Sequence, residues 1–303
     1  MSAYLPRILM YHNFSSDESR VPGAVPTLAL RSQLQYLVAH FNVISLSTLL
    51  RQLRNGRFDP FSVAITVDDG RRNFYEHLFP LLKEFNLPAT FFVVASFIDG
   101  KDWIWTDKVL WLSDQPQAPV SLRSDRIHAH FEKLNLMRPE VRSEHILSLA
   151  SSMHVTIPDS PPDKYGPCSW GELQEMAESR LVEIGSHTVT HPILSTLTSD
   201  ESWHELRTSR HQIEDKLGQA VTSFCFPNGT TSDFNPCHIQ QLQDAGYTNA
   251  VVSRFGFVSA NSGEFELPRI GISDETDRLT FSKYVDGVEH YQAKILQRAS
   301  THL

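Results

Sequence analysis

Short apolar runs alternate with helical patterns along this chain, and this alternation constrains the fold more than any other feature. Seven runs are rich in apolar and β-branched residues, at positions 8–11, 62–67, 89–94, 181–185, 221–226, 249–252 and 266–272. Helical patterns are predicted at residues 31–41, 47–53, about 73–85, 170–178 and 201–217. Ser169 and Glu172 have capping-box spacing, and Gly218 marks a helix end. Strands that alternate with helices pair in parallel, so we expect an α/β fold whose parallel sheet is closed or nearly closed.

Residues 99–164 interrupt this rhythm. The segment contains Trp103, Trp105 and Trp111, continues into charged helical sequence and ends near the prolines of residues 158–162. We interpret it as a helical insertion. Flat tryptophan rings suit both sugar stacking and core packing. Packing is expected for Trp111, and both interpretations stay open for Trp103 and Trp105.

Two polar clusters stand where two of the predicted strands end. Asp68 and Asp69 follow the run at residues 62–67, and His187 and His191 follow the run at residues 181–185. Barrel-type α/β folds place their chemistry at the carboxyl ends of the strands. We therefore expect these four side chains to lie close together.

The residue types in these clusters suit a divalent metal ion such as zinc. Imidazole nitrogens and carboxylate oxygens are zinc ligands, and a catalytic site uses three of them and keeps one position open. His187 and His191 have the spacing of one helical turn, which predicts that they face the same point. One of Asp68 and Asp69 would then be the third ligand. The other would take a proton from water whose pKa the ion lowers towards ~7. Alone, each cluster is more typical of a turn or an exposed helix face; together they indicate a site.

Both clusters resemble motifs of one known family. Thr-Val-Asp-Asp-Gly at residues 66–70 resembles the Thr-Phe-Asp-Asp-Gly motif of the polysaccharide deacetylase family (NodB-like, carbohydrate esterase family four). Ser-His-Thr-Val-Thr-His at residues 186–191 is similar to that family's His-Ser/Thr-x-x-His motif, and residues 87–93 resemble the family's strand after the first helix. The similarity covers roughly residues 8–272.

The resemblance implies a fold and a set of roles. It implies one NodB-like domain over residues 1–303, a distorted (β/α) barrel of about seven parallel strands, with residues 99–164 as an insertion within it. It also implies a divalent ion, with zinc expected, bound by three residues, and a fourth residue acting as general base. The implied ligands are Asp69, His187 and His191, and the implied base is Asp68.

Two further motifs of the family are altered or missing here. Its Arg-x-Pro-Tyr/Trp-Gly motif corresponds to residues 225–229, where Cys225 replaces the arginine and Asn228 the aromatic residue. The backbone N–H of Asn228 is expected to hold the oxyanion, because that role needs only a backbone donor. The other interpretation of this string is a plain turn.

The family's Leu-x-His motif, which supplies the general acid, has no match, so the acid stays unassigned. His12 follows the first strand and is a further candidate for the same face, although a lone histidine is more often structural. The nearest equivalent of the missing motif contains Arg269. A permanently charged guanidinium is suited to orienting a carboxylate. We predict that Arg269 contacts Asp68, with a surface position as the alternative.

Composition excludes several classes of protein. A net charge of −8 argues against a nucleic-acid-binding surface. The three cysteines lack zinc-finger spacing and indicate no disulfide framework. No run is long enough to span a bilayer, and no signal-peptide pattern opens the chain, so a cytoplasmic location is expected. The sequence gives no indication of the oligomeric state.

These features predict a metal-dependent polysaccharide or N-acetylglucosamine deacetylase. It would remove acetyl groups from N-acetylated sugar units of a surface or exported polysaccharide, or of its precursor, during polysaccharide biosynthesis. One alternative is an amidohydrolase that acts on a small non-sugar amide. Another is an inactive sugar-binding relative, suggested by the two altered motifs. The presence of all four residues of the polar clusters argues against the inactive protein.

Overall fold

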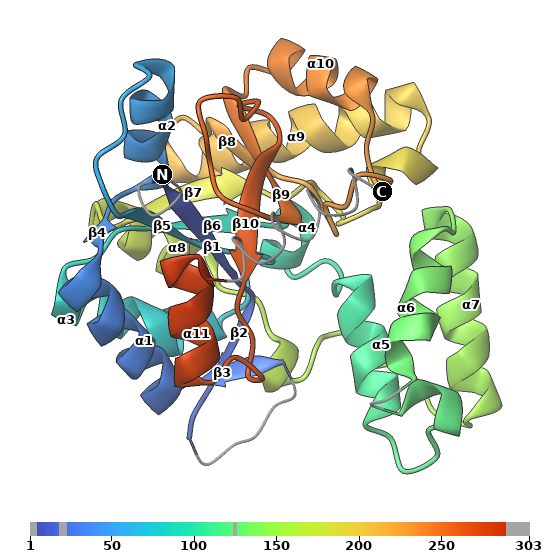
Figure 1. The fold of residues 1–303 in the computed structure, drawn as a ribbon. Helices are drawn as coiled ribbons and strands as arrows, with labels where there is room; N and C mark the ends of the chain where they lie inside the picture. The colour runs from blue at the N-terminus through green and yellow to red at the C-terminus, as the bar shows by residue number, and fades with distance from the viewer. Residues whose placement is uncertain (1–4, 18–22, 124–125, 289–303) are drawn as a thin grey trace, which may run out of the picture.

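Seven parallel strands close into a barrel, which confirms the expected fold (Figure 1). The computed structural model describes residues 5–17, 23–123 and 126–288. The barrel strands are β1 (Arg7–Tyr11), β5 (Ser62–Val67), β6 (Ala89–Val93), β7 (Val182–Ser186), β8 (Ser223–Cys225), β9 (Asn249–Phe255) and β10 (Leu267–Gly271). β1 pairs in parallel with both β5 and β10, and these two pairings close the barrel. The two-residue strand β4 (Asn42–Val43) also pairs with β5.

The register of the strands brings their carboxyl ends to one end of the barrel. Tyr11 at the end of β1 is level with Val67 at the end of β5. Val93 of β6 is level with Ser186 of β7, which in turn pairs with Phe224 of β8. The residues that follow these strands therefore meet at the same edge, as the sequence predicted for the two polar clusters.

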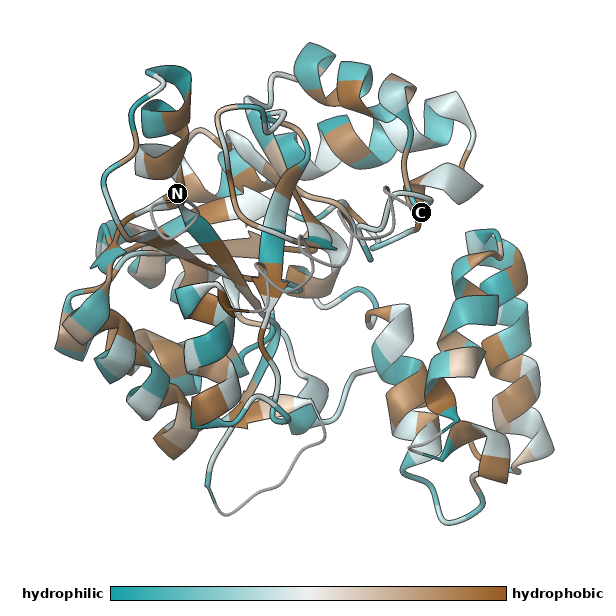
Figure 2. Cartoon of the chain, in the orientation of Figure 1, coloured by the Kyte–Doolittle hydropathy of each residue, from teal (hydrophilic) through white to brown (hydrophobic). Residues whose placement is uncertain are grey.

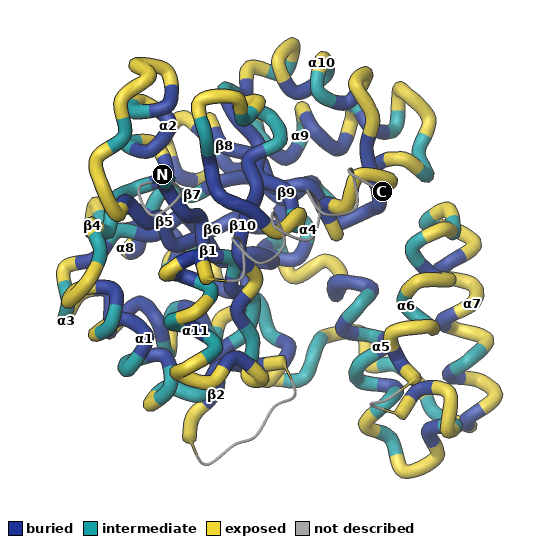
Figure 3. The backbone as a smooth tube through the Cα atoms, viewed as in Figure 1, coloured by how far each residue is buried: buried dark blue, intermediate teal, exposed yellow. Residues whose placement is uncertain are grey.

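Helices surround the barrel, and the strands beneath them are largely hydrophobic (Figure 2) and largely buried (Figure 3). The helices are α1 (Thr27–His40), α2 (Leu46–Arg54), α3 (Phe79–Phe85), α4 (Ala95–Ile98), α8 (Trp170–Glu178), α9 (Ser199–Leu217), α10 (Pro236–Asp244) and α11 (Arg278–Asp286). The predicted capping box of Ser169 and Glu172 is present at the start of α8. The pairing of β2 (Asn13–Ser15) with β3 (Ala24–Pro26), like α10 and α11, was not predicted from the sequence.

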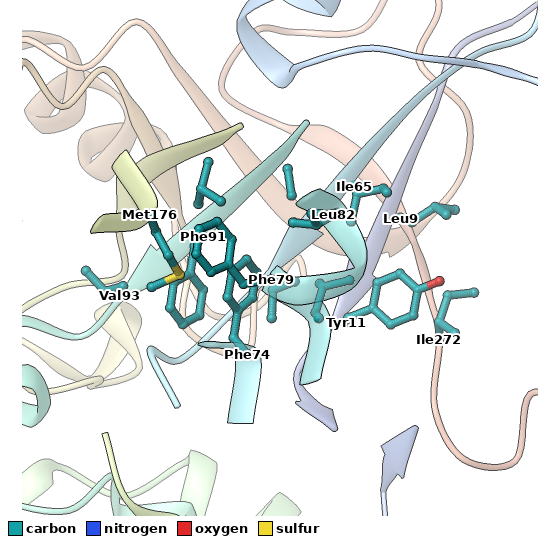
Figure 4. Close-up of a cluster of buried hydrophobic side chains, with 14 of the residues drawn as sticks. Leu9, Tyr11, Ile65, Phe74, Phe79, Leu82, Phe91, Val93, Met176 and Ile272 are labelled. Carbon is teal, nitrogen blue, oxygen red and sulfur yellow. The ribbon is translucent and has the colours of Figure 1, made fainter. Parts of the chain in front are cut away.

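The main hydrophobic core fills the space between the barrel and its helices (Figure 4). Phe74 lies in a π-helical turn (Phe74–Leu78) shortly after the aspartate pair, and its ring stacks on Phe91 of β6 with centroids 4.1 Å apart. Inside the barrel, Phe92 and Val251 belong to a second buried cluster that includes leucines of α2. Both clusters anchor the strands whose ends carry the polar residues.

The segment after α4 forms a helical unit beside the barrel (Figure 1). Its helices are α5 (Trp105–Ser113), α6 (Ile127–Asn135) and α7 (Pro139–Ser152), and they share an apolar cluster that includes Leu112, Leu134 and Ile146. Trp103 and Trp105 are both buried, so they pack inside the protein and form no exposed stacking wall for a sugar. Among the described residues, no helix is both long and apolar enough to cross a lipid bilayer.

The close packing of β7 inside the barrel predicts a large cost for adding one methyl group there. A Cβ on Gly185 would lie 2.5 Å from Cδ1 of Phe92 and 3.1 Å from the backbone oxygen of Ser223. Phe92 is fully buried, and side chains in protein cores are closely packed. We expect Gly185→Ala to lower the free energy of unfolding by roughly 1–3 kcal/mol, because overpacking forces strain on the core.

The matched control is Gly171→Ala in α8, where the nearest atom to a new Cβ is 3.9 Å away. There alanine should be neutral or stabilising, by up to roughly 1 kcal/mol. Urea unfolding of both variants measures the difference, and equal stability of the two would contradict the packing argument.

Candidate active site

The chain reverses sharply after β5, and this turn presents two adjacent carboxylates. The N–H of Asp68 still donates to the carbonyl of Tyr11 at 3.0 Å and extends the strand ladder. Asp69 has a φ of 82° and Gly70 a φ of 95°, so the backbone turns through the left-handed region at two successive residues. The turn directs the two carboxylates to different partners.

The two histidines lie in the loop after β7, and their side chains converge. The Nε2 atoms of His187 and His191 are 3.1 Å apart, and both residues are buried. The sequence argument for this convergence was wrong, because the segment is no helix: Thr188 has a φ of 69° and His191 a φ of 58°. The loop is held by Glu205 of α9, whose carboxylate accepts from the N–H groups of Val189 and Thr190 at 2.7 and 3.0 Å.

Asp69 completes a group of three ligand-type atoms. Its Oδ1 atom lies 3.6 Å from the Nε2 atoms of both His187 and His191. The Nδ1 atom of His187 lies 2.7 Å from the carbonyl of Cys225. A carbonyl only accepts, so Nδ1 carries the proton and Nε2 keeps its lone pair for a metal ion.

The protonation of this group fits a divalent metal ion. Burial lowers the pKa of His187, and burial together with His187 lowers the pKa of His191 to about 3, so both rings are neutral at pH 7. Burial alone would raise the pKa of Asp69, but the nearby positive groups, of which Arg71 has the largest effect, together outweigh burial, and the carboxylate stays ionised. Two neutral imidazoles and one carboxylate are a donor set that zinc prefers.

A second group of three possible ligand residues is less suited to a metal. It consists of Asp68, His187 and Cys225. Burial raises the pKa of the Cys225 thiol well above its usual value, and its Sγ already lies 3.2 Å from the positive Nη2 of Arg269. Both oxygens of Asp68 are already bound to an arginine. The first group is therefore the candidate metal site.

Arg269 lies directly against Asp68, as predicted, and the alternative surface position is wrong. Its Nη1 and Nη2 atoms donate to Oδ1 and Oδ2 of Asp68, both at 2.7 Å, and Arg269 is fully buried. Its Nε donates to the carbonyl of Val252 at 3.1 Å, which fixes the plane of the guanidinium. Burial alone would raise the pKa of Asp68, but Arg269, with smaller contributions from His12 and His187, outweighs burial and holds the pKa below its ordinary value.

Cys225 has a small side chain that lies against the ion pair of Asp68 and Arg269. Its Sγ lies 3.4 Å from Oδ2 of Asp68 and 3.2 Å from Nη2 of Arg269. Cys225, which stands at the position of the family's motif arginine, thus contacts Arg269, an arginine of strand β10. The contact between Arg269 and Asp68 is therefore supplied from β10, while β8 provides a small side chain.

The structure adds two charged residues that the sequence analysis missed. Arg71 donates to Oδ2 of Asp69 at 3.1 Å, and its Nη1 lies 2.5 Å from Oδ1 of Asp107 on α5. Burial raises the pKa of Asp107 to about 6 although Arg71 opposes this. Arg71 directly follows the Asp-Asp-Gly string, and this position could have identified it from the sequence as a residue of the site. Asp107 lies 36 positions after Arg71 along the chain, and no local sequence pattern indicated that it belongs to the site.

His12 and Asn228 lie near the candidate site in different ways. Nε2 of His12 is 3.6 Å from Oδ2 of Asp68, and the His12 side chain is 43 % exposed. Asn228 follows Cys225 by three residues and has a φ of 58°, so the expected turn is present. Its side-chain Nδ2 donates to Asp233 at 2.7 Å. The backbone role of Asn228 stays a prediction.

Sequence comparison relates the chain to a known family. The family model for polysaccharide deacetylases matches residues 55–250, well over half of the chain. The chain is 22 % identical to the Bacillus subtilis protein YxkH over 291 residues, which covers 95 % of this chain and 78 % of YxkH. It is 35 % identical over 74 residues to a poly-β-1,6-N-acetyl-D-glucosamine N-deacetylase of Staphylococcus epidermidis, over 24 % of this chain and 26 % of that protein.

Solved structures share the fold at low sequence identity. The deacetylase PplD of Streptococcus pyogenes aligns with a TM-score of 0.64 and 19 % identity, over 93 % of this chain and 98 % of PplD. IcaB from Ammonifex degensii aligns with a TM-score of 0.64 and 17 % identity, over 93 % of this chain and 97 % of IcaB. With the matching family model, the barrel and the motifs at its strand ends support one conclusion: the chain belongs to the polysaccharide deacetylase family.

Proposed function

We propose that this protein is a zinc-dependent hydrolase that removes acetyl groups from N-acetylated sugar units of a surface or exported polysaccharide, or of its precursor. The observation that carries the proposal is the convergence of Asp69, His187 and His191 beside the Asp68–Arg269 pair. The family supports deacetylation, and the name of the staphylococcal relative supports an N-acetylglucosamine polymer as the substrate.

In this proposal, Asp69, His187 and His191 hold the metal ion. When bound, the ion would act as a Lewis acid that lowers the pKa of water and polarises a carbonyl oxygen. Asp68 takes a proton from the attacking water, and Arg269 keeps Asp68 ionised and fixed in orientation. Fixed orientation lowers the entropic barrier, because the base does not have to search for its geometry.

The remaining steps are assigned to residues at the open side of the site. His12, partly exposed and 3.6 Å from Asp68, would donate a proton to the leaving amine. The backbone N–H of Asn228 would donate to the oxyanion as the acetamide carbonyl becomes tetrahedral. Acetate and a free amine are the products.

The competing hypotheses differ in substrate or in activity. Hydrolysis of a small non-sugar amide would use the same residues, so acetate release from N-acetylglucosamine oligomers must exceed release from small acetamides. An inactive sugar-binding protein would need neither the ionised Asp68 nor the converging histidines. An acetate-release screen with metal analysis of the purified protein tests all three hypotheses. Absence of acetate release from every N-acetylated sugar, with zinc bound, would reject the proposal.

The first prediction concerns the ligands of the metal ion. We expect about one zinc ion per chain, because the site offers one set of three ligands. His187→Ala or His191→Ala should lose both the metal and the acetate-release activity. His211→Ala is the matched control, because His211 is exposed on α9. Elemental analysis measures the metal, and full occupancy in either ligand variant would show that the assignment is wrong.

The second prediction separates the adjacent carboxylates. Asp68→Asn should keep the metal and lower turnover roughly 10²–10⁴-fold, because it removes a general base. Asp69→Asn should instead weaken metal binding, because it removes a charged ligand. Metal titration and kcat of the metal-saturated variants distinguish the two effects. Metal loss in the first variant with retention in the second would reverse the assigned roles.

The third prediction concerns the pH dependence that Arg269 sets. Arg269 lowers the pKa of Asp68, so the wild-type base stays ionised to unusually low pH. In Arg269→Met the pKa of Asp68 should rise, since a neighbouring cation lowers the pKa of a carboxylate and the variant removes that cation. Asp68 then becomes protonated at higher pH, and the acid limb of the pH–rate profile moves upward.

Two further variants make this result interpretable. Arg269→Lys keeps a positive charge without the two-pronged contact and should give an intermediate profile. Arg254→Met removes an exposed arginine of the neighbouring strand β9 and should leave the profile unchanged. If the acid limb of Arg269→Met coincides with that of the wild type, another group controls the ionisation of Asp68.

A further inference from the structure

A cavity of about 450 Å³ lies between the helical unit α5–α7 and the loop that carries His191. Its lining includes Trp103, Trp105, Arg142 and Thr190. Thr190 directly precedes His191, and Nε1 of Trp105 donates to the carbonyl of His191 at 3.2 Å. The cavity is therefore adjacent to the candidate metal site, and none of the roles assigned above uses it.

Arg142 is a buried cation that forms no ion pair with the described residues, although the charge of Glu140 acts on its pKa. Only 3 % of its surface is exposed, and Nη1 is buried without a hydrogen-bond acceptor. Within the described part of the chain, no carboxylate forms an ion pair with it; its guanidinium lies over the ring of Trp105, 4.3 Å from the centroid. Burial lowers the pKa of Arg142 to about 10, so it is still protonated at neutral pH. Burying an unpaired charge is costly, and a protein that keeps one there gains something else from it.

Trp103 of the lining carries a second buried donor. Nε1 of Trp103 has no acceptor, and Trp103 is 4 % exposed. The two lysines of the lining are already paired: Lys101 with Asp99 at 2.7 Å and Lys108 with Asp102 at 2.6 Å. Among the buried groups of the lining, the two without a partner are both donors, and one of them is charged; the carboxylate of Asp159, which also lines the cavity, is exposed to solvent. The matching ligand therefore offers acceptor oxygens and a negative charge.

We propose that this cavity binds an anionic group, a carboxylate or a phosphate, on the carbohydrate substrate. The inference rests on the proposed function and narrows it: the N-acetylated unit lies at the candidate active site while an acidic group of the same glycan enters the cavity. A guanidinium presents parallel N–H donors that match carboxylate and phosphate oxygens. A volume of this size suits a small polar group or one sugar ring.

Binding of three small sugars to the metal-loaded full chain tests the proposal. N-acetylmuramic acid carries a carboxylate, N-acetylglucosamine 1-phosphate carries a phosphate, and N-acetylglucosamine is neutral. We expect at least one acidic sugar to bind about tenfold or more tightly than the neutral sugar, as charge-assisted bidentate contacts do. The sugar that shows this preference identifies carboxylate or phosphate as the recognised group. Isothermal titration calorimetry gives the affinities without any need for turnover.

The variants separate the cavity from the metal site, where anions also bind. Arg142→Met should abolish the preference for the acidic sugar, and Arg142→Lys should keep part of it. Arg138→Met is the matched control, because Arg138 begins the same helix but pairs at the surface with Glu201 at 2.7 Å. It should bind like the wild type. Metal-site binding is unchanged in all three, so it cancels in the comparison.

The stability of Arg142→Met shows whether the arginine is merely structural. Replacing an unpaired buried charge by an apolar side chain should leave the melting temperature equal or higher, because the cost of burying the charge is removed. Equal affinity of the wild type for acidic and neutral sugars, or a preference that persists in Arg142→Met, would overturn the proposal. Loss of anion binding in Arg142→Met without acetate release from any sugar would support the anion site and reject the deacetylase function. Acetate release without any preference for acidic sugars would support the deacetylase function and reject the anion site.

Discussion

The buried ion pair between Asp68 and Arg269 is the interaction on which the candidate site depends. Asp68 follows β5, and Arg269 lies on β10, so the pair joins two strands that β1 separates in the barrel. Removing two charges from water is expensive, and only good geometry with additional hydrogen bonds offsets that cost. Both oxygens of Asp68 are bound, and the guanidinium has further partners in Thr66 and Val252. The barrel must therefore close correctly before the pair can form.

The same pair explains how the family's altered motif is tolerated. In the proposed reaction, the base needs a cation beside it, and which strand carries the cation is secondary. At the position of the motif arginine, Cys225 provides a small neutral side chain in contact with both members of the pair. A second arginine at this position would add an unpaired buried charge. The cysteine and the arginine of β10 are thus two parts of one arrangement.

The sequence predicted the barrel more fully than it predicted the contacts of the site. Every residue of β5 is buried, so its apolar run was a clear signal, whereas β2 and β3 are three residues each and too short to show a period. The residues of the site could be named because they stand at strand ends, which parallel pairing brings together. The convergence of His187 and His191 was predicted for the wrong reason, because the residues between them do not form a helical turn. It depends on Glu205 of α9, a helix that follows the loop in the chain. The role of Asp107 could not be predicted from the sequence, because its pairing with Arg71 is set by how the helical unit packs on the barrel.

The two oxygens of Asp69 have different partners, and this division fixes how the carboxylate faces the histidines. Oδ2 accepts from Arg71, so the free lone pairs of Oδ1 point to the Nε2 atoms of the two imidazoles. An arginine so close to a metal ligand would oppose the charge of a divalent cation. Asp107 on the far side of Arg71 counters that charge and holds the guanidinium in place. Because outer partners of this kind orient metal ligands and tune their charge, the helical unit contributes to the candidate metal site without supplying a ligand.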